Sequence, residues 1–209
     1  MKHEWRKDEK QFYLPKNKPE LATIPRFKFY TIEGEGNPND DHFAEYVGVL
    51  YALSYGIKMS PKKGFAPKGY FEYAVYPLEG VWDLNEEGRK TYDGTINKNH
   101  LVFKLMIRQP DFVDQDFALE NIELTKKKKR HALLDHIKFE EMIEGDCIQM
   151  MHLGSYDSEP ESFKIMESFA DQENYFRKLK THREIYLSDA RKVAPDQLKT
   201  VLRFSLGKT

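Results

Sequence analysis

The sequence predicts an α+β fold made of two tandem βαββ units, whose antiparallel sheets form a central ligand groove. Two observations predict it. The order strand, helix, strand, strand occurs twice, and the first strand of each copy ends at glycine, at Gly34 and Gly36 and again at Gly154. The last strand of each copy alternates apolar residues in the same way, at 101–107 and at 198–206. This agreement favours an internal duplication.

In the first copy, residues 26–36 alternate like a strand and then reach glycines, which predicts a strand and a turn. Apolar residues at helical spacing predict a helix over 40–59. A loop rich in proline, lysine and glycine leads to a second strand over 69–80, interrupted by a proline, and a third strand follows over 100–110. The polar stretch before Glu20 contains two prolines and is expected to be extended.

Between the copies, a helical pattern over 114–130 ends in the run KKKKR. Such a run suits a solvated helix end, because cations there complement the negative end of the helix dipole. In the second copy, the pattern predicts a strand over 146–159 and a helix over 159–179. Two further strands are expected over 182–190 and 198–208.

The chain is expected to form one domain over residues 1–209, since a globule of this length buries about 70% of its unfolded surface. Its two pseudo-symmetric halves are expected at about 21–110 and 137–209. A helical linker over 111–136 is expected to join them.

The charge and cysteine content narrow the class of protein. There are 33 basic and 34 acidic residues, for a net charge of −1, and this balance argues against a dedicated nucleic-acid binder. The single cysteine, Cys147, excludes an intramolecular disulfide framework and fits a reducing compartment. No segment approaches the apolar length of a membrane span, so a cytoplasmic protein is expected.

The common catalytic and cofactor motifs are absent from the sequence. It has no glycine-rich nucleotide loop, no HExxH and no GxSxG. The seven histidines are scattered, and His131 and His136 are five apart, which does not suit a ligand pair on one helix face. We therefore expect no cofactor and no metal site, and we expect Cys147 to be a core residue.

The stretch HREIYLSDARK, residues 182–192, carries a charge in a probable core strand. A strand period of two places Ile185 and Leu187 on one face, expected to be core under a helix, with Glu184 and Tyr186 on the other face. One interpretation of Glu184 is a salt bridge to Arg183, Arg191 or a lysine on a neighbouring strand. The alternative is a desolvated carboxylate that pairs with a cationic ligand or serves as general acid or base.

Other candidate ligand contacts are aromatic residues and methionines. Tyr51 and Tyr55 are four apart and share one face of the helix over 40–59. Trp82 follows the turn PLEG, and Met106 and Met151 lie on predicted strands. Methionine suits a pocket that adapts to ligands of varied shape. Ordinary packing in the core is the alternative for each of them.

Several segments resemble the GyrI-like small-molecule-binding proteins, specifically their stand-alone subgroup. The matching segments cover nearly the whole chain in order, and the one that begins at His182 is quite specific. It implies a tandem pair of βαββ units around a central groove. The segments that carry it are YLPKNKPEL, IEGEGNPND, YPLEGVWD, MIRQPDF, MMHLGSYDSEP and HREIYLSDARKVAPDQLKTVLR.

The resemblance also implies a class of ligand and a set of site residues. The family groove binds amphipathic compounds that are often cationic or polyaromatic, and Glu184 stands at the position of the central acidic contact. Some stand-alone members resemble hydrolases that open the cyclopropane ring of DNA-alkylating cyclopropanoids with the help of an aromatic cage. In that case Trp82, Tyr55 and Tyr186 are candidate cage members, and Glu184 would position water or stabilise developing charge. Asp83 stands where the family pattern carries a second tryptophan.

Three functions follow as expectations. The first is binding of xenobiotics for sequestration or detoxification, in which Tyr51, Tyr55, Trp82, Met106, Met151, Glu184 and Tyr186 contact the ligand. The second is hydrolysis of cyclopropanoids, with Glu184, Trp82 and Tyr55 in the catalytic site. The third is a protein-partner module like the gyrase-inhibiting relatives. We expect a monomer or weak homodimer that does not bind a membrane. Direct binding of nucleic acid is not expected either, because too few residues precede the first strand for a helix-turn-helix.

Overall fold

The computed structural model describes residues 2–208 as a mixed α+β fold with antiparallel strands. Its packing divides the chain into two compact units. Of the described residues, unit 1 contains 2–3, 27–78 and 82–142, and unit 2 contains 4–26, 79–81 and 143–208. The units are interleaved along the chain, and the duplicated halves stay a prediction.

The elements of the described chain have the following bounds. The helices are α1 (Trp5–Asp8), α2 (Lys10–Tyr13), α3 (Asp41–Lys58), α4 (Glu86–Lys90), α5 (Gln115–Lys128) and α6 (Glu159–Gln172). The strands are β1 (Glu20–Glu35), β2 (Leu78–Leu84), β3 (Leu101–Gln109), β4 (Lys138–Leu153), β5 (Tyr175–Arg177), β6 (His182–Tyr186) and β7 (Lys199–Lys208). Short 3-10 helices lie at Pro61–Lys63, Lys98–His100, Ala132–His136, Tyr156–Ser158 and Pro195–Gln197.

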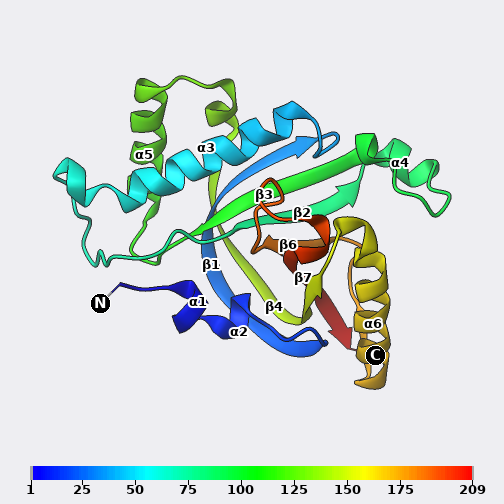
Figure 1. The fold of residues 1–209 in the computed structure, drawn as a ribbon. Coiled ribbons are helices and arrows are strands. Elements are labelled where there is room, and N and C mark those ends of the chain that lie inside the picture. Colours follow the sequence, from blue (N-terminus) through cyan, green and yellow to red (C-terminus); the bar gives the residue numbers. More distant parts are fainter. Residues whose placement is uncertain (1, 209) are drawn as a thin grey trace. The chain divides into compact units, whose positions relative to one another are not determined.

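Unit 1 is a sheet covered by two long helices (Figure 1). Its strands are ordered β4-β1-β3-β2, and β1 and β3 are antiparallel from the Lys28–Gln109 pair to the Glu35–Val102 pair. Helix α3 packs on β3 and α5 packs on α3. Asn121 of α5 donates hydrogen bonds to the hydroxyl of Tyr30 and the carbonyl of Leu53, so buried polar groups join both helices to the sheet.

Unit 2 is organised around β7 (Figure 1). Its strands are ordered β2-β6-β7-β5, and β4 also pairs with β7. Helix α6 covers one face of this sheet through an apolar core that includes Met166 and Ala170 of the helix and Met150, Leu202 and Phe204 of the strands. Amphipathic spacing along α6 explains this docking, because its buried residues recur every three to four positions.

Most sequence predictions of elements are confirmed. The helix expected over 40–59 is α3, the helical pattern over 114–130 is α5, and the strand over 100–110 is β3. Asp114 caps α5 by accepting a hydrogen bond from the backbone N–H of Phe117. Cys147 is completely buried, and burial raises the pKa of its thiol to about 12, so it is a core residue as predicted.

Three predictions of local structure are wrong. Residues 69–77 are not a strand, and β2 begins only at Leu78, since the preceding proline has no N–H to donate to a ladder. The stretch before Glu20 is not simply extended, because it contains α1 and α2. The helix expected over 159–179 ends at Gln172, where Asn174 adopts φ 61 and the chain turns into β5.

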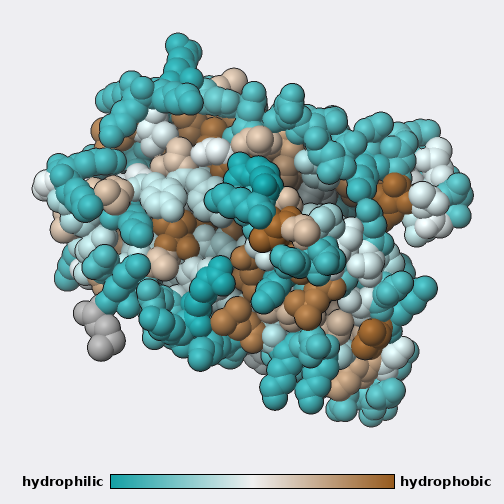
Figure 2. Space-filling view, viewed as in Figure 1, coloured by the Kyte–Doolittle hydropathy of each residue, from teal (hydrophilic) through white to brown (hydrophobic). Residues whose placement is uncertain are grey.

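The face of the molecule seen in Figure 2 is mostly polar. In Figure 2 hydrophilic residues dominate over α5, and hydrophobic residues show as separate spots over α6. Isolated exposed apolar side chains of this kind are normal for a folded domain. No helix within residues 2–208 has the length and apolar character needed to cross a membrane.

Candidate functional site

Two acidic side chains and a histidine meet in unit 2, at the first residue of α6 and along β6. They are Glu159, His182 and Glu184, and one possible ligand atom from each lies within 4.8 Å of the others. The residues Glu159 and Glu184 are only 6% and 8% exposed. Charged groups are seldom buried to this degree without a specific reason.

The register of β6 explains why Glu184 meets α6. Glu184 is paired with Leu202 of β7, and Leu202 belongs to the apolar core under α6. Directly paired residues of antiparallel strands share a face, so Glu184 is on the side of the sheet that α6 covers. Ile185, which is paired with Val201, is on the opposite face. The prediction that Ile185 and Leu187 form the core under the helix is therefore wrong, and Leu187 lies beyond the end of β6.

This error has a physical reason. Helix α6 presents apolar residues such as Met166 to the sheet along its middle, but its first residue is Glu159. The face under the helix is therefore polar at one end. The opposite face of β6 is also buried, since Ile185 is inaccessible to solvent, and an alternating strand buried on both faces does not reveal which side a helix covers.

Both oxygens of Glu184 are held by neighbours on its own strand. The Nε2 atom of His182 lies 2.8 Å from Oε1, and the hydroxyl of Tyr186 donates to Oε2 at 2.8 Å. The predicted salt bridge to Arg183 or Arg191 is wrong. Arg183 pairs with glutamates on the other face, and Arg191 pairs with Asp189. Alternation explains this, because residues 183 and 184 point to opposite sides of the sheet.

Glu159 has a different environment from Glu184. Its Oε1 atom is buried and has no hydrogen-bond partner among the described residues. Burial raises the pKa of Glu159 well above its usual value, and the charge of Glu184 raises it further. Burial and the neighbouring Glu184 therefore both favour the protonated form of Glu159, as expected when two acidic groups share one site.

Aromatic rings surround the two acidic groups. Phe163 meets the ring of His182 edge-on at 4.6 Å between centroids, and Tyr156 meets Tyr186 edge-on at 6.0 Å. Burial raises the pKa of Tyr156 to about 12, with Glu184 and Glu159 contributing. A buried acid beside a carboxylate, with rings around them, can stabilise a cation or transfer a proton.

A histidine and serine network fixes the start of α6. One ring nitrogen of His152, Nδ1, lies 2.8 Å from the hydroxyl of Ser162, and the other, Nε2, lies 3.0 Å from the carbonyl of Ser155. Ser158 also contacts Nε2, at 3.3 Å. These contacts anchor the first turn of the helix that carries Glu159, so they position that side chain.

The sequence reasoning missed Glu159 and His182. The segment SEPES contains a helix start, with Pro160 near the first helical position, and this signal places an acidic side chain at a helix N-terminus. For His182 the signal was its position two residues before Glu184 on the same strand, which puts both side chains on one face. Neither signal shows that the two segments meet.

The same three side chains are of the types that bind divalent cations. Within residues 2–208 they are the one such group of three or more. However, His182 Nε2 and Glu184 Oε1 are at hydrogen-bond distance, so these potential ligands satisfy each other. The geometry is that of a hydrogen-bonded acidic cluster.

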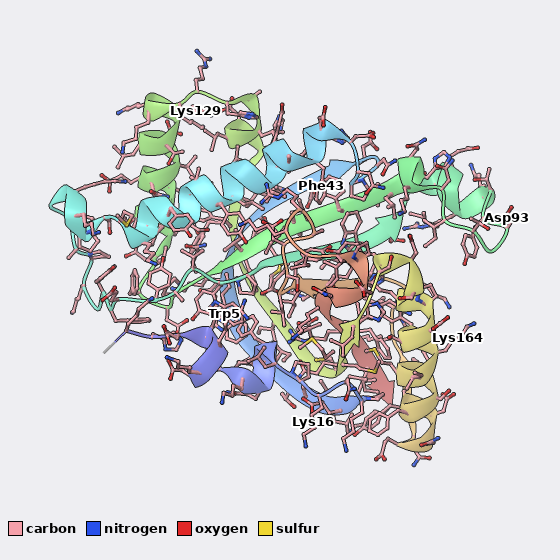
Figure 3. The ribbon with its side chains drawn as sticks, in the orientation of Figure 1. Trp5, Lys16, Phe43, Asp93, Lys129 and Lys164 are labelled. Atoms are coloured by element: carbon pink, nitrogen blue, oxygen red, sulfur yellow. The ribbon has the colours of Figure 1, made fainter. Side chains whose placement is uncertain are left out.

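The predicted tryptophan contact lies in unit 1, in an aromatic group of its own. Trp82 is 7% exposed and packs against Phe43 of α3, with ring centroids 6.0 Å apart, and against Phe103 of β3 at 5.3 Å. Figure 3 labels Phe43 near the start of α3. Tyr46 meets Phe103 edge-on, and a side chain at Gly34 would collide with both rings. A glycine there permits the close approach of these rings to the backbone.

The remaining predicted residues are distributed over both units. In unit 1, the ring centroids of Tyr51 and Tyr55 on α3 are 6.4 Å apart. Tyr55 is 51% exposed, whereas Met106 of β3 is fully buried. In unit 2, Met151 is paired with Val201 and therefore lies on the face of the sheet opposite Glu184. Of the predicted set, the structure brings Glu184 together with Tyr186, and Tyr51 together with Tyr55.

Comparison with known proteins identifies the family. Residues 17–206 match the GyrI-like small molecule binding domain. The chain belongs to the GyrI-like family. The resemblance and the fold class inferred from the sequence are thereby confirmed.

Solved structures with a similar fold support this family assignment. A hydrolase from Listeria innocua is 34% identical with a TM-score of 0.89, covering 99% of this chain and 100% of that one. An uncharacterized conserved protein from Listeria innocua is also 34% identical, with a TM-score of 0.86 and coverage of 98% and 100%. The EcmrR C-terminal domain is 13% identical with a TM-score of 0.53, covering 92% and 98%, and shows the fold alone. No protein of curated function is significantly similar to the chain.

Proposed function

We propose that this GyrI-like protein binds amphipathic molecules that combine aromatic rings with a positive charge, and that Glu159 and Glu184 receive the charged end. The observation that carries the proposal is a buried acidic pair whose ion-pair contact within residues 2–208 comes from His182, and not from an arginine or a lysine. Ionising both groups in a buried site is unfavourable unless an opposite charge compensates them. A cationic ligand would supply that charge.

The surrounding rings suit the same ligand. Phe163, Tyr156 and Tyr186 lie around the acidic pair, and cations are attracted to ring faces. The family membership supports small-molecule binding in general. Tyr51, Tyr55 and Trp82 of unit 1 stay proposed ligand contacts, and each needs its own variant.

The test uses two probes of the same shape. Benzyltrimethylammonium is cationic, and neopentylbenzene replaces its nitrogen by carbon. We expect wild type to bind the cation at least about tenfold more tightly, a difference of about 1.4 kcal/mol. The Glu184→Gln variant should lose most of this preference. Glu161→Gln, which alters an exposed glutamate of α6, is the matched control. Equal affinity of wild type for both probes, measured by calorimetry, would refute the proposal.

Hydrolysis is a second candidate, favoured by the raised pKa of Glu159 beside Glu184 and by the similarity to hydrolases of Listeria innocua at 32% and 34% identity. In an activated cyclopropane, a water oxygen would bond to a ring carbon as the carbon–carbon bond breaks. The electron pair would move through the conjugated system to a carbonyl oxygen, which takes the proton of Glu159. Glu184 would take a proton from the attacking water, so the product is the substrate plus water.

Mass spectrometry can test this second candidate. A cyclopropanoid alkylator incubated with the protein should yield the ring-opened hydrate faster than without protein. The Glu159→Gln variant should lose at least about a hundredfold in rate, as is typical of losing a general acid. Tight binding without hydrate above the protein-free rate would leave binding as the function and exclude this hydrolysis.

A further inference from the structure

The two acidic groups of the pair are not equivalent in their hydrogen bonds. Glu184 receives contacts on both oxygens, from His182 at 2.8 Å and from the hydroxyl of Tyr186 at 2.8 Å. Tyr186 is the donor in its contact, and with a proton on Nε2 of His182 the carboxylate of Glu184 accepts on both oxygens, as an ionised group can because it offers lone pairs and no proton. Glu159 has a side-chain hydrogen bond with Glu184, and its buried Oε1 atom has no hydrogen-bond partner within residues 2–208.

The donors to Glu184 are themselves held in place. The ring of His182 packs edge-on against Phe163 of α6. The guanidinium of Arg177 lies 4.9 Å from the centre of the same Phe163 ring. The ring of Tyr186 packs edge-on against Tyr156. Each donor therefore has an aromatic support that restricts its rotation.

The charged and titratable groups facing the pair come from two elements. The 3-10 helix before α6 contributes Tyr156 and Asp157, and both act on the pair electrostatically. Strand β6 contributes His182 and Tyr186. Strand β7 contributes Leu202 opposite Glu184 and Thr200 opposite Tyr186, and neither of these is charged. His182 and Tyr186 are the two of these groups at hydrogen-bond distance from the pair, and both contact Glu184.

We propose that His182 and Tyr186 are positioning residues that fix the single proton of the acidic pair on Glu159. By holding Glu184 as the anion, they divide the pair into a defined proton donor and a defined anion. This inference rests on the proposed function, since the division has a use only where the pair meets a ligand. It assigns the charge-pairing role to Glu184 and the proton-releasing role to Glu159.

The test reads the proton position directly and needs no ligand. Carbon-13 NMR of the glutamate carboxyl carbons in the full-length protein separates protonated from ionised groups, and Glu159→Gln and Glu184→Gln assign the two signals. In wild type at neutral pH, we expect Glu159 to carry the proton at least about ten times more often than Glu184, a preference of about one pKa unit. Tyr186→Phe and His182→Leu should each shift the proton toward Glu184.

Conservative variants separate positioning from folding. His182→Gln keeps a donor and should retain most of the wild-type distribution, whereas His136→Gln, which alters an exposed histidine of unit 1, should not change it. The proposal is overturned if Glu184 holds the proton in wild type, or if Tyr186→Phe and His182→Leu both leave the distribution unchanged. Either result would leave the binding test with cationic and neutral probes unaffected, so the two failures are distinguishable.

Discussion

Arg183 and Glu184 are adjacent residues of β6 with the same exposure of 8%, yet the charges around them are organised in opposite ways. Arg183 pairs with Glu79 at 2.7 Å and with Glu144 at 3.2 Å, and Arg203 pairs with Glu144 at 3.0 Å. Every charge in this group faces an opposite one. Glu184, on the other face, lies beside a second acidic group.

The difference separates a structural cluster from the proposed ligand site. The Arg183 cluster (Glu79, Glu144, Arg183 and Arg203) also fixes the chain near the N-terminus, because Arg203 donates to the carbonyl of Phe12. In the acidic pair, burial and the neighbouring Glu184 disfavour the ionised form of Glu159. Buried groups with strongly shifted pKa values concentrate at functional sites, which agrees with the proposed role of the pair.

The largest expected effect comes from breaking the Arg183 cluster. Glu144→Gln leaves two buried arginines with incomplete partners, so we expect a loss of about 3–5 kcal/mol in the free energy of unfolding. Urea denaturation measures it. The control is Glu86→Gln, which breaks an exposed pair with Lys90 and should cost less than about 0.5 kcal/mol. Similar losses in both variants would contradict the contrast between buried and exposed pairs.

Acid should weaken the same cluster. Burial alone would raise the pKa of Glu144, but the charges of Arg183 and Arg203 outweigh it and hold this pKa below 4.5. A lowered folded pKa means that the stabilisation is present above pH 4.5 and is lost as the pH falls through the folded value. Unfolding free energies measured from pH 6 to pH 3 should therefore decrease less steeply in Glu144→Gln than in wild type.

The acidic pair should respond to pH in the opposite sense. The folded pKa of Glu159 is raised, so this group destabilises the folded protein. The destabilisation is absent below the unfolded pKa of 4.5 and grows as the pH rises toward the folded pKa. Glu159→Gln should therefore stabilise the protein by about 1 kcal/mol or more at pH 8. At pH 4 the gain should be smaller, as denaturant titrations at both pH values can show. A loss of stability of Glu159→Gln at pH 8 would contradict the expected destabilisation by Glu159.

The smallest effect on stability is expected in unit 1. Tyr55 is 51% exposed, so Tyr55→Ala should change the unfolding free energy by no more than about 0.5 kcal/mol. If Tyr55 contacts the ligand as predicted, the same variant should bind benzyltrimethylammonium several-fold more weakly. Unchanged affinity, measured by calorimetry, would remove Tyr55 from the proposed contacts.

Local patterns predicted much of the fold, since periodicity alone locates α3, β3 and β7. It could not locate β5, because three residues are too few to establish a period. It also placed Glu184 on the wrong side relative to α6, because both faces of β6 are buried.

The site was only partly predictable for a related reason. Strand alternation singles out Glu184 and Tyr186 on one face, and the resemblance adds the role of Glu184 as the central acidic contact. Glu159 is separated from Glu184 by 25 positions, and the packing of α6 on β6 and β7 brings the two together. A single sequence carries no direct signal of such a tertiary contact. Charge repulsion within the pair became visible only with the fold.

The most direct test of the central claim, that the acidic pair receives a cationic ligand, is proton release on binding. Calorimetry of benzyltrimethylammonium binding at pH 7, in buffers that differ in ionisation enthalpy, counts the protons released. The account predicts release approaching about one proton per bound cation in wild type, because the ligand displaces the proton held by the pair, and almost none in Glu159→Gln. Cation binding with no proton release in wild type, and unchanged in Glu159→Gln, would contradict it.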